Sequence, residues 1–443
     1  MLSTTKRVDL RWYALALLAA LCGLSSNAQA QLQIEITSGV ERPIPMAIVP
    51  FGWRGPGPRA PFDLAGVVTA DLGNSGRFDP IPVTDMISQP TQPAQVRFND
   101  WQILDVDVLL IGELSEDSPG RYSVVFQLFD VLRGEQLLGF RLTAATEDLR
   151  ATGHRIADMV FEALTGIPGV FSTRIAYVSE ERNGGTRTFR LIVADADGEN
   201  ARVIAESSQP LMSPAWSPDG RRVAYVSFEG NQSAIYVQTL RTGSRERVSS
   251  RAGVNSAPAF SPDGRRLALT LSQDTGNLDI YTLDLATQVL RRLTENPAID
   301  TEPTWSNDGR SIYFTSDRQG GPQIYSVADE PGGQARRVTF EGSYNARARV
   351  SPDGESLAVV HQNQNNYRIA VVDPNTGFTQ VLTDGALDES PSFAPNGAAI
   401  IYATREGNRG VLAAVSSDGR IKQQIASVAG DVREPVWSPY ARP

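Results

Sequence analysis

The stretch WSPDG at residues 216–220 recurs in five variants through the second half of the chain. The variants are FSPDG at 260–264, WSNDG at 305–309, VSPDG at 350–354, FAPNG at 393–397 and WSPY at 437–440. Their third positions lie 43–45 residues apart, which is the length of one four-stranded blade of a β-propeller. Proline presets φ in such a motif and glycine accepts a positive φ, so each motif predicts a tight turn between two strands.

The two ends of the repeat array predict how the ring closes. The first unit starts at Arg174 with RIAYVS and lacks an innermost strand, whereas the last strand, Glu434–Ser438, has no further strand after it. Together the two fragments complete one blade and remove the exposed edges of an open array. We therefore expect a six-bladed all-β propeller over residues 174–443, closed by the C-terminal strand. An open array or a stacked β-solenoid would leave the complementary half-units unexplained.

Residues 43–165 show no such period and predict an α/β domain. The expected elements, in the order β-α-β-α-β-β-β-α, are Met46–Phe51, Phe62–Leu72, Phe78–Val83, Asn99–Leu104, Val106–Leu114, Tyr122–Leu132, Gln136–Ala144 and Asp148–Leu164. This order predicts a mixed sheet covered by helices. Residues 166–173, which begin Gly-Ile-Pro-Gly, are the expected linker to the propeller.

The first thirty residues are typical of a signal peptide. Lys6, Arg7 and Arg11 precede an apolar stretch, and Ala28-Gln29-Ala30 has the small-x-small pattern of a cleavage site. The pattern predicts secretion and a mature chain that starts at Gln31 and does not span a membrane. A lipoprotein acylated at Cys22 is the alternative interpretation.

Residues 31–42 form a separate predicted segment. Leu32, Ile34 and Ile36 alternate with polar residues, which indicates a strand without an obvious partner in its own domain. Such a strand can add to the edge of another protein's sheet, so the three side chains are candidate protein-binding residues. A frayed terminus without a function is the alternative.

The composition excludes several functions. The net charge is −9, whereas nucleic acids and anionic membranes require a cationic surface. The chain has one cysteine and two histidines, His154 and His361, which lie in different predicted domains. It contains no G-x-S-x-G elbow, Walker loop or dinucleotide-binding glycine motif. The turn aspartates, such as Asp219, occur once per blade, so turn formation explains them better than calcium binding.

We therefore expect no catalytic residue, cofactor or metal ion. A secreted propeller enzyme, such as a polysaccharide lyase or a peptidase, remains the alternative to a binding scaffold.

The strongest candidate for a binding site is one mouth of the propeller channel. We expect polar residues on the connections that lead into the innermost strands to gather there, since loops on a rigid scaffold commonly carry function. The candidates are Asn255, Ala257, Thr301, Glu302, Asn345, Arg347, Asp388, Glu389 and Glu434. Converging carboxylates favour a partner with positive charge and hydrogen-bond donors. A solvated rim without a function is the alternative.

The whole chain resembles the TolB family of the Tol–Pal cell-envelope system. The resemblance rests on IVPFGW at 48–53, ADL at 70–72, SGRF at 75–78, FQLFDV at 126–131, LTG at 164–166 and FSTRIAYV at 171–178, together with the repeats. Family motifs that carry binding residues match APAFSPDG at 257–264 and TEPTW at 301–305, which singles out Ala257, Thr301 and Glu302. The sequence departs from the family at Val254, where relatives often have histidine.

The resemblance implies a non-enzymatic periplasmic scaffold. It implies that the channel mouth docks the peptidoglycan-associated lipoprotein Pal, and that colicin-type peptides exploit the same mouth. It also implies that the N-terminal segment reaches the inner-membrane protein TolA, in support of envelope integrity and cell division.

Overall fold

The structure, a computed structural model, describes residues 42–273, 276–330, 332–425 and 430–441. The predicted signal peptide and the candidate residues Leu32, Ile34 and Ile36 lie outside this part. Within it, no helix is both long and apolar enough to cross a membrane.

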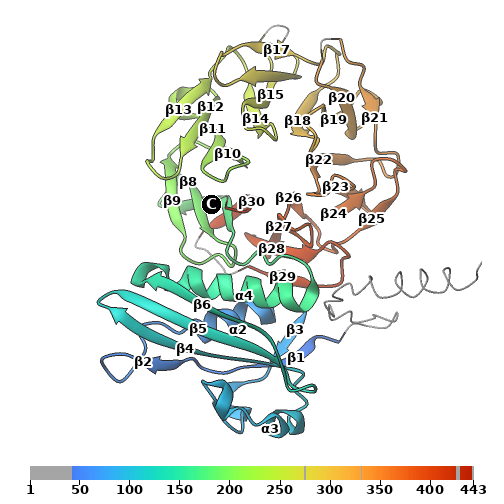
Figure 1. The fold of residues 1–443 in the computed structure, drawn as a ribbon. Coiled ribbons are helices and arrows are strands. Elements are labelled where there is room, and N and C mark those ends of the chain that lie inside the picture. Colours follow the sequence, from blue (N-terminus) through green and yellow to red (C-terminus); the bar gives the residue numbers. More distant parts are fainter. Residues whose placement is uncertain (1–41, 274–275, 331, 426–429, 442–443) are drawn as a thin grey trace, which may run out of the picture. The chain divides into compact units, whose positions relative to one another are not determined.

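The N-terminal part is an α/β domain with a mixed sheet, as predicted (Figure 1). Its strands are β1 (Ile44–Ile48), β2 (Gly52–Arg54), β3 (Phe78–Pro80), β4 (Val108–Ser118), β5 (Arg121–Asp130) and β6 (Glu135–Ala145). Its α-helices are α2 (Leu64–Asn74), α3 (Phe98–Ile103) and α4 (Leu149–Thr165). The sheet order is β3-β1-β4-β5-β6, with β2 paired to β4. Strand β1 runs parallel to β3 and β4, whereas β4, β5 and β6 are antiparallel. The sequence did not predict β2, which has only three residues.

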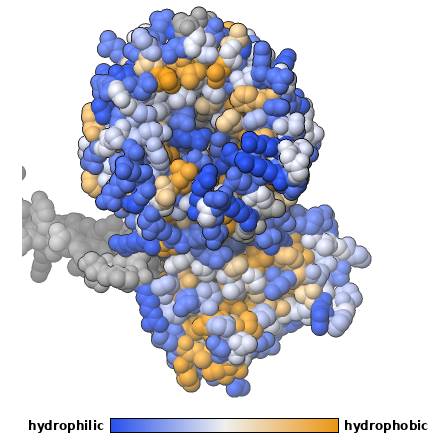
Figure 2. All heavy atoms as spheres, turned by 180° about the vertical axis from the view of Figure 1, so that it is seen from behind, coloured by the Kyte–Doolittle hydropathy of each residue, from blue (hydrophilic) through white to orange (hydrophobic). Residues whose placement is uncertain are grey.

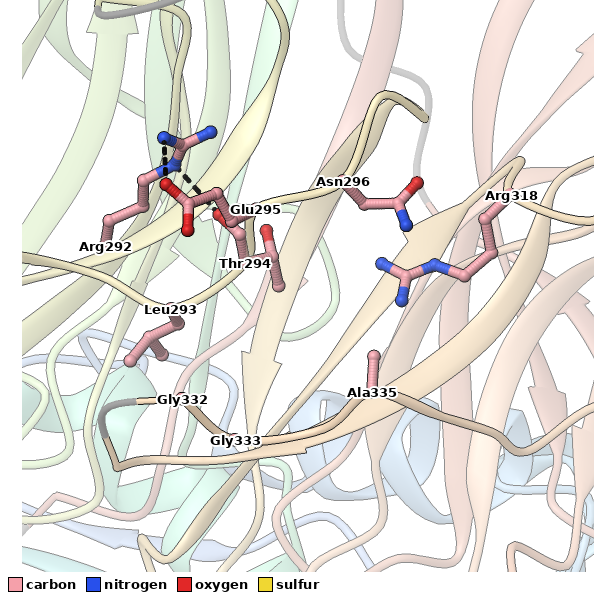
Figure 3. Close-up of a pocket in the computed structure, with 9 residues that line it drawn as sticks. All are labelled: Arg292, Leu293, Thr294, Glu295, Asn296, Arg318, Gly332, Gly333 and Ala335. Carbon is pink, nitrogen blue, oxygen red and sulfur yellow. Dashed lines mark hydrogen bonds and ion pairs between the residues drawn. The ribbon is translucent and has the colours of Figure 1, made fainter.

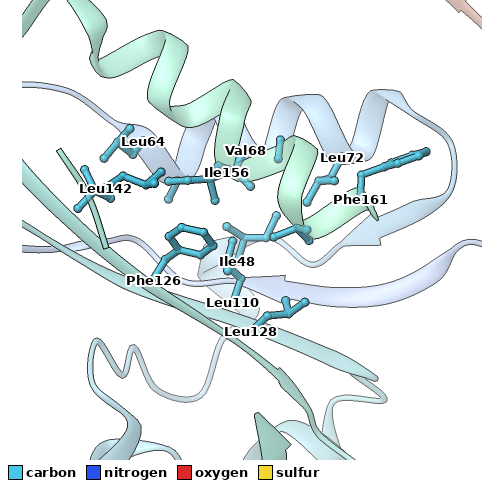
Figure 4. Packing of buried hydrophobic residues seen from close by; sticks show 14 of the residues in the cluster. Ile48, Leu64, Val68, Leu72, Leu110, Phe126, Leu128, Leu142, Ile156 and Phe161 are labelled. Atoms are coloured by element: carbon cyan, nitrogen blue, oxygen red, sulfur yellow. The ribbon is translucent and has the colours of Figure 1, made fainter. Parts of the chain in front are cut away.

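Both faces of this sheet are covered because side chains alternate along its central strands. On β4, Leu110 packs towards α2 and α4, while Leu109 and Ile111 pack towards the fully buried Trp101 of α3 on the other face. Figure 4 shows the first layer, in which Val68 of α2 and Ile156 of α4 lie over the sheet.

The C-terminal part is a ring of six four-stranded blades (Figure 1). The first blade contains β7 (Arg174–Asn183), β8 (Thr186–Asp195) and β9 (Arg202–Ser207), and its innermost strand is β30 (Asp431–Trp437). The second blade contains β10 (Leu211–Trp216), β11 (Arg222–Ser227), β12 (Ala234–Thr239) and β13 (Arg245–Ser249). The third blade contains β14 (Asn255–Phe260), β15 (Arg266–Leu271), β16 (Asp279–Asp284) and β17 (Leu290–Arg292). The fourth contains β18 (Asp300–Trp305), β19 (Ser311–Ser316), β20 (Gln323–Ala328) and β21 (Arg336–Arg337). The fifth blade contains β22 (Asn345–Val350), β23 (Leu357–Asn363), β24 (Asn366–Val372) and β25 (Thr379–Val381). The sixth blade contains β26 (Glu389–Phe393), β27 (Ala399–Glu406), β28 (Arg409–Ser416) and β29 (Lys422–Gln424).

Each pair of neighbouring blades shares one hydrophobic cluster. On β11, Val223 and Tyr225 pack against the preceding blade, whereas Ala224 and Val226 pack against the following one. The same division occurs around the ring, because successive side chains of a strand point to opposite faces of its sheet. Every blade therefore needs both neighbours to bury its two faces.

The repeated motifs form the predicted turns. Gly220 and Gly264 have φ of 65° and 69°, and the carboxylate of Asp219 accepts a hydrogen bond from the Arg221 amide at 3.0 Å. The turns also join blades, since Arg174 donates to the Gly220 carbonyl oxygen at 2.8 Å and stacks on Trp216. Arg222 repeats this contact with Gly264 and Phe260 of the next blade.

The predicted closure is confirmed. Strand β30 pairs antiparallel with β7, with Val432 opposite Ser179 and Trp437 opposite Ile175. The indole of Trp437 is nearly buried and donates to the Thr173 hydroxyl at 2.7 Å.

Ending the chain at Asp431 should abolish cooperative unfolding of the propeller, because the truncation removes most of an innermost strand and reopens the ring. Calorimetry and near-UV circular dichroism measure this loss. A chain that ends at Tyr440 keeps β30 and is the matched control. An unchanged melting temperature after the longer truncation would contradict the role of the closing strand.

Candidate protein-binding site at the channel mouth

The innermost strand of every blade carries a β-bulge at the same position. The pairing register shifts at each bulge, and one non-glycine residue there has φ between 48° and 58°. These residues are Ser213, Ala257, Glu302, Arg347, Ser390 and Glu434. A left-handed conformation costs a non-glycine residue about 1–2 kcal/mol. The same conformation recurs in all six blades, and bulges commonly redirect side chains at binding sites.

Arg347 links side chains from four consecutive blades across this level of the channel. Its Nε lies 2.8 Å from Oε1 of Glu302 without a well-aligned hydrogen bond, and its Nη2 lies 3.6 Å from Oε2 of Glu434. Its Nη1 donates to the Ser390 hydroxyl. Glu302 also accepts from the Thr315 hydroxyl at 3.1 Å, and Glu434 accepts from the Ser213 amide.

The charges at this level are of both signs. Burial alone would lower the pKa of Arg347, but Glu434, Glu302 and Glu389 raise it above the usual value, so this guanidinium stays charged. Burial and the nearby Arg347 lower the pKa of Arg349 to about 10. Two arginines, Arg347 and Arg349, therefore lie beside the predicted carboxylates at this opening.

Three of the predicted contact residues hold the backbone instead of facing the opening. Asn255 and Asn345 are fully buried, and Asp388 is 1% exposed. The Asn255 side-chain oxygen accepts from the Arg251 backbone amide at 2.9 Å, and the Asn345 side-chain amide donates to the Glu341 carbonyl oxygen at 2.8 Å. Asp388 accepts from the Gly385 backbone amide at 3.2 Å. Asn255 and Asn345 begin strands β14 and β22, so their predicted place on the connections was wrong. Asn and Asp side chains commonly form hydrogen bonds of this kind with nearby backbone groups.

The other candidates remain partly accessible. Ala257, Thr301, Glu302, Arg347 and Glu389 are of intermediate exposure, and Glu434 is 8% exposed. These residues lie in the first positions of the inner strands, which brings them to one end of the channel.

Two exposed apolar residues at this end were not predicted. Val254 and Ile299 are 40% and 47% exposed and directly precede β14 and β18. Val254 and Ile299 occupy equivalent positions in two blades, directly before Asn255 and Asp300. This equivalence is visible in the sequence and could have identified both as candidates. Figure 2 shows that isolated hydrophobic groups also occur among hydrophilic ones around the hollow of the propeller. Exposed apolar groups beside polar ones are typical of protein-binding surfaces.

A second hollow lies away from the inner strands and offers little charge to a ligand. This pocket of about 260 Å³ is lined by Arg292 and Arg318, among others (Figure 3). Arg292 already contacts Asp279 at 2.7 Å, and Arg318 contacts Asp300 at 2.8 Å. Their charges are compensated within the protein, so the channel mouth is the better candidate.

The fold and this mouth define a two-domain β-propeller protein with a preorganised polar opening. The pattern described as "TolB beta propeller domain" matches residues 161–441, and that described as "TolB amino-terminal domain" matches residues 32–137. The chain belongs to the TolB family.

Relatives and a solved structure agree with this assignment. "Tol-Pal system protein TolB" of Thioalkalivibrio sulfidiphilus is 56% identical over 96% of this chain and 98% of its own. The protein of the same description in Xanthomonas euvesicatoria pv. vesicatoria is 50% identical over 97% of this chain and 98% of its own. The crystal structure of TolB from Acinetobacter baumannii is similar with a TM-score of 0.82, at 42% identity, over 90% of this chain and 97% of that one.

Replacing Arg347 by methionine should destabilise the propeller by about 3 kcal/mol, because Glu302 and Glu434 lose their shared counter-charge in a largely enclosed place. Denaturant unfolding measures the effect. Arg310→Met is the control, since Arg310 is 86% exposed. Adding Glu302→Gln to Arg347→Met should recover part of the loss, and strictly additive effects would contradict the proposed coupling.

Proposed function

We propose that this protein is a non-enzymatic periplasmic scaffold of the Tol–Pal system. Its channel mouth docks a Pal-like peptidoglycan-associated lipoprotein, and its N-terminal segment binds a TolA-like inner-membrane protein. The link between the two membranes supports envelope integrity and cell division. Membership of the TolB family, whose relatives carry the description "Tol-Pal system protein", supports this proposal.

The observation that carries the docking site is the ring of six bulged residues at one level of the channel. Backbone strain held by a closed ring preorganises the mouth, so little conformational entropy is lost when a partner binds. Val254 and Ile299 add apolar area beside it. A partner segment that inserts a few side chains and offers hydrogen-bond donors and acceptors fits this combination better than a strongly cationic one.

Val254→Arg and Ile299→Arg should each weaken binding of the soluble domain of the organism's Pal at least about tenfold, or about 1.4 kcal/mol, by placing a hydrated charge in the interface. Isothermal titration calorimetry measures the affinity. These positions suit the test better than Glu302, because Glu302 is paired with Arg347 and its replacement would also disturb the fold.

Val289→Arg is the matched control, because Val289 is 63% exposed and precedes β17, away from the inner strands. Unchanged affinity of both mouth variants, with the control also unchanged, would remove the mouth as the docking site.

Deleting residues 31–39 should abolish binding of the TolA-like partner and leave Pal binding within about threefold. The reason is the alternating pattern of Leu32, Ile34 and Ile36, which suits strand addition to a partner's sheet. Pull-down and calorimetry with both partners measure the two effects on one protein. Undiminished binding of the TolA-like partner would show that the segment is only a tail.

A further inference from the structure

A cluster of charged side chains lies where the α/β domain contacts the first blade, and the proposed function does not use it. It contains Asp71 of α2, Arg150 and His154 of α4, and Asp195 and Asp197 at the turn from β8 to β9. The His154 side chain is 2% exposed and that of Asp71 is 3% exposed.

The orientation of the His154 ring leaves one nitrogen without a hydrogen-bond partner. Its Nδ1 lies 2.7 Å from Oδ2 of Asp71, which as an ionised carboxylate can only accept. The proton is then on Nδ1, and Nε2 of the neutral ring carries a lone pair. Nε2 is buried and lies 3.7 Å from Oδ2 of Asp195 and 3.9 Å from Oδ2 of Asp197, too far for a hydrogen bond.

We propose that Nε2 of His154 and the carboxylates of Asp195 and Asp197 bind a divalent transition-metal ion of the zinc type. The ligand atoms of a tetrahedral zinc ion, each about 2.0–2.1 Å from the metal, lie about 3.4 Å from one another. The separations of Nε2 from the two carboxylate oxygens, 3.7 Å and 3.9 Å, are slightly longer than this value, so a bound ion would draw these atoms together. Asp71 is then the outer carboxylate that holds the ring, an arrangement common among metal-binding histidines.

The carboxylates of Asp195 and Asp197 are held in place by their own turn. The Asn200 amide donates to Oδ2 of Asp195 at 2.7 Å, and the Glu199 backbone amide donates to Oδ1 of Asp197 at 3.0 Å. A pocket of about 300 Å³ is lined by Asp71 and Asp197, so it borders two carboxylates of the cluster.

The charge balance also favours a divalent cation. The carboxylates of Asp71, Asp158, Asp195 and Asp197 lie around His154, and Arg150 contacts two of them. Charged groups in a poorly solvated place need a counter-charge, which a divalent ion bound at neutral Nε2 would supply. Arg150 already contacts Asp197 and lies 3.5 Å from Asp195, so it would share their oxygens with the metal.

The competing occupant of Nε2 is a proton. Burial lowers the pKa of His154, but the carboxylates of Asp195 and Asp71 raise it, to about 9. A metal ion must therefore displace this proton when it binds.

The test is a titration of the tag-free mature protein with zinc chloride after removal of metals with a chelator. We expect binding of one ion, a higher melting temperature in its presence, and the visible absorption of tetrahedral cobalt when cobalt replaces zinc. His154→Gln and Asp197→Asn should each weaken zinc binding at least about tenfold. The cobalt spectrum reports on the ligands even if a variant is less stable.

His361→Gln is the matched control, because His361 is the only other histidine and its Nδ1 is 2.9 Å from Asn345 in the propeller, with no contact to the cluster. It should bind zinc as the unchanged protein does. Failure to bind zinc would show that the ring holds only a proton and would overturn the proposal. Equal zinc binding by His154→Gln, or the same stabilisation by calcium, would overturn it too. None of these results depends on Pal binding, so the metal site and the proposed function are tested independently.

Discussion

The pairing of β30 with β7 is the contact on which the propeller depends. It joins residues 175–180 to residues 431–437 and places the last strand of the chain inside the first blade. Because each blade buries its two faces against two different neighbours, a missing strand exposes hydrophobic surface on both sides of one blade. Closure therefore makes the stability of every blade a property of the whole ring, unlike that of an open repeat array.

The closed ring also explains how the channel mouth can hold strained residues. Six left-handed residues would cost several kcal/mol in isolated strands, and the packing between blades must compensate for that cost. In return, the bulges bring Glu302, Arg347 and Glu434 from three different blades into contact. A site of this kind has little freedom to rearrange, so specificity for a partner follows from its shape and from the position of its charges.

Polar contacts join the linker, residues 166–173, to the α/β domain on one side and to the propeller on the other. Asp158 of α4 accepts a hydrogen bond from the Phe171 amide at 2.7 Å, and Asn396 of the sixth blade donates to the Pro168 carbonyl oxygen at 2.8 Å. Interfaces between domains of one chain are commonly more polar than those of permanent complexes. A metal ion bound by His154 and the carboxylates of the β8–β9 turn would tie one helix directly to the first blade.

By itself, the sequence determined the fold class, the number of blades, the closing strand and, apart from β2, the order of helices and strands in the α/β domain. Repeated turn motifs and alternating side chains are local signals, and they remain readable without knowledge of the contacts. The tertiary structure alone decided which predicted residues reach the opening. Asn255, Asn345 and Asp388 are buried because each forms hydrogen bonds with its own loop or neighbouring strand.

The bulges do have a local signal in the sequence. Proline follows the bulged residue in five of the six inner strands, and proline seldom occurs inside a regularly hydrogen-bonded strand. No comparable signal existed for the pairing of Arg347 with Glu434 or of His154 with Asp71. The partners are far apart in the chain, and only the closed ring and the packing of α2 against α4 bring their charges together.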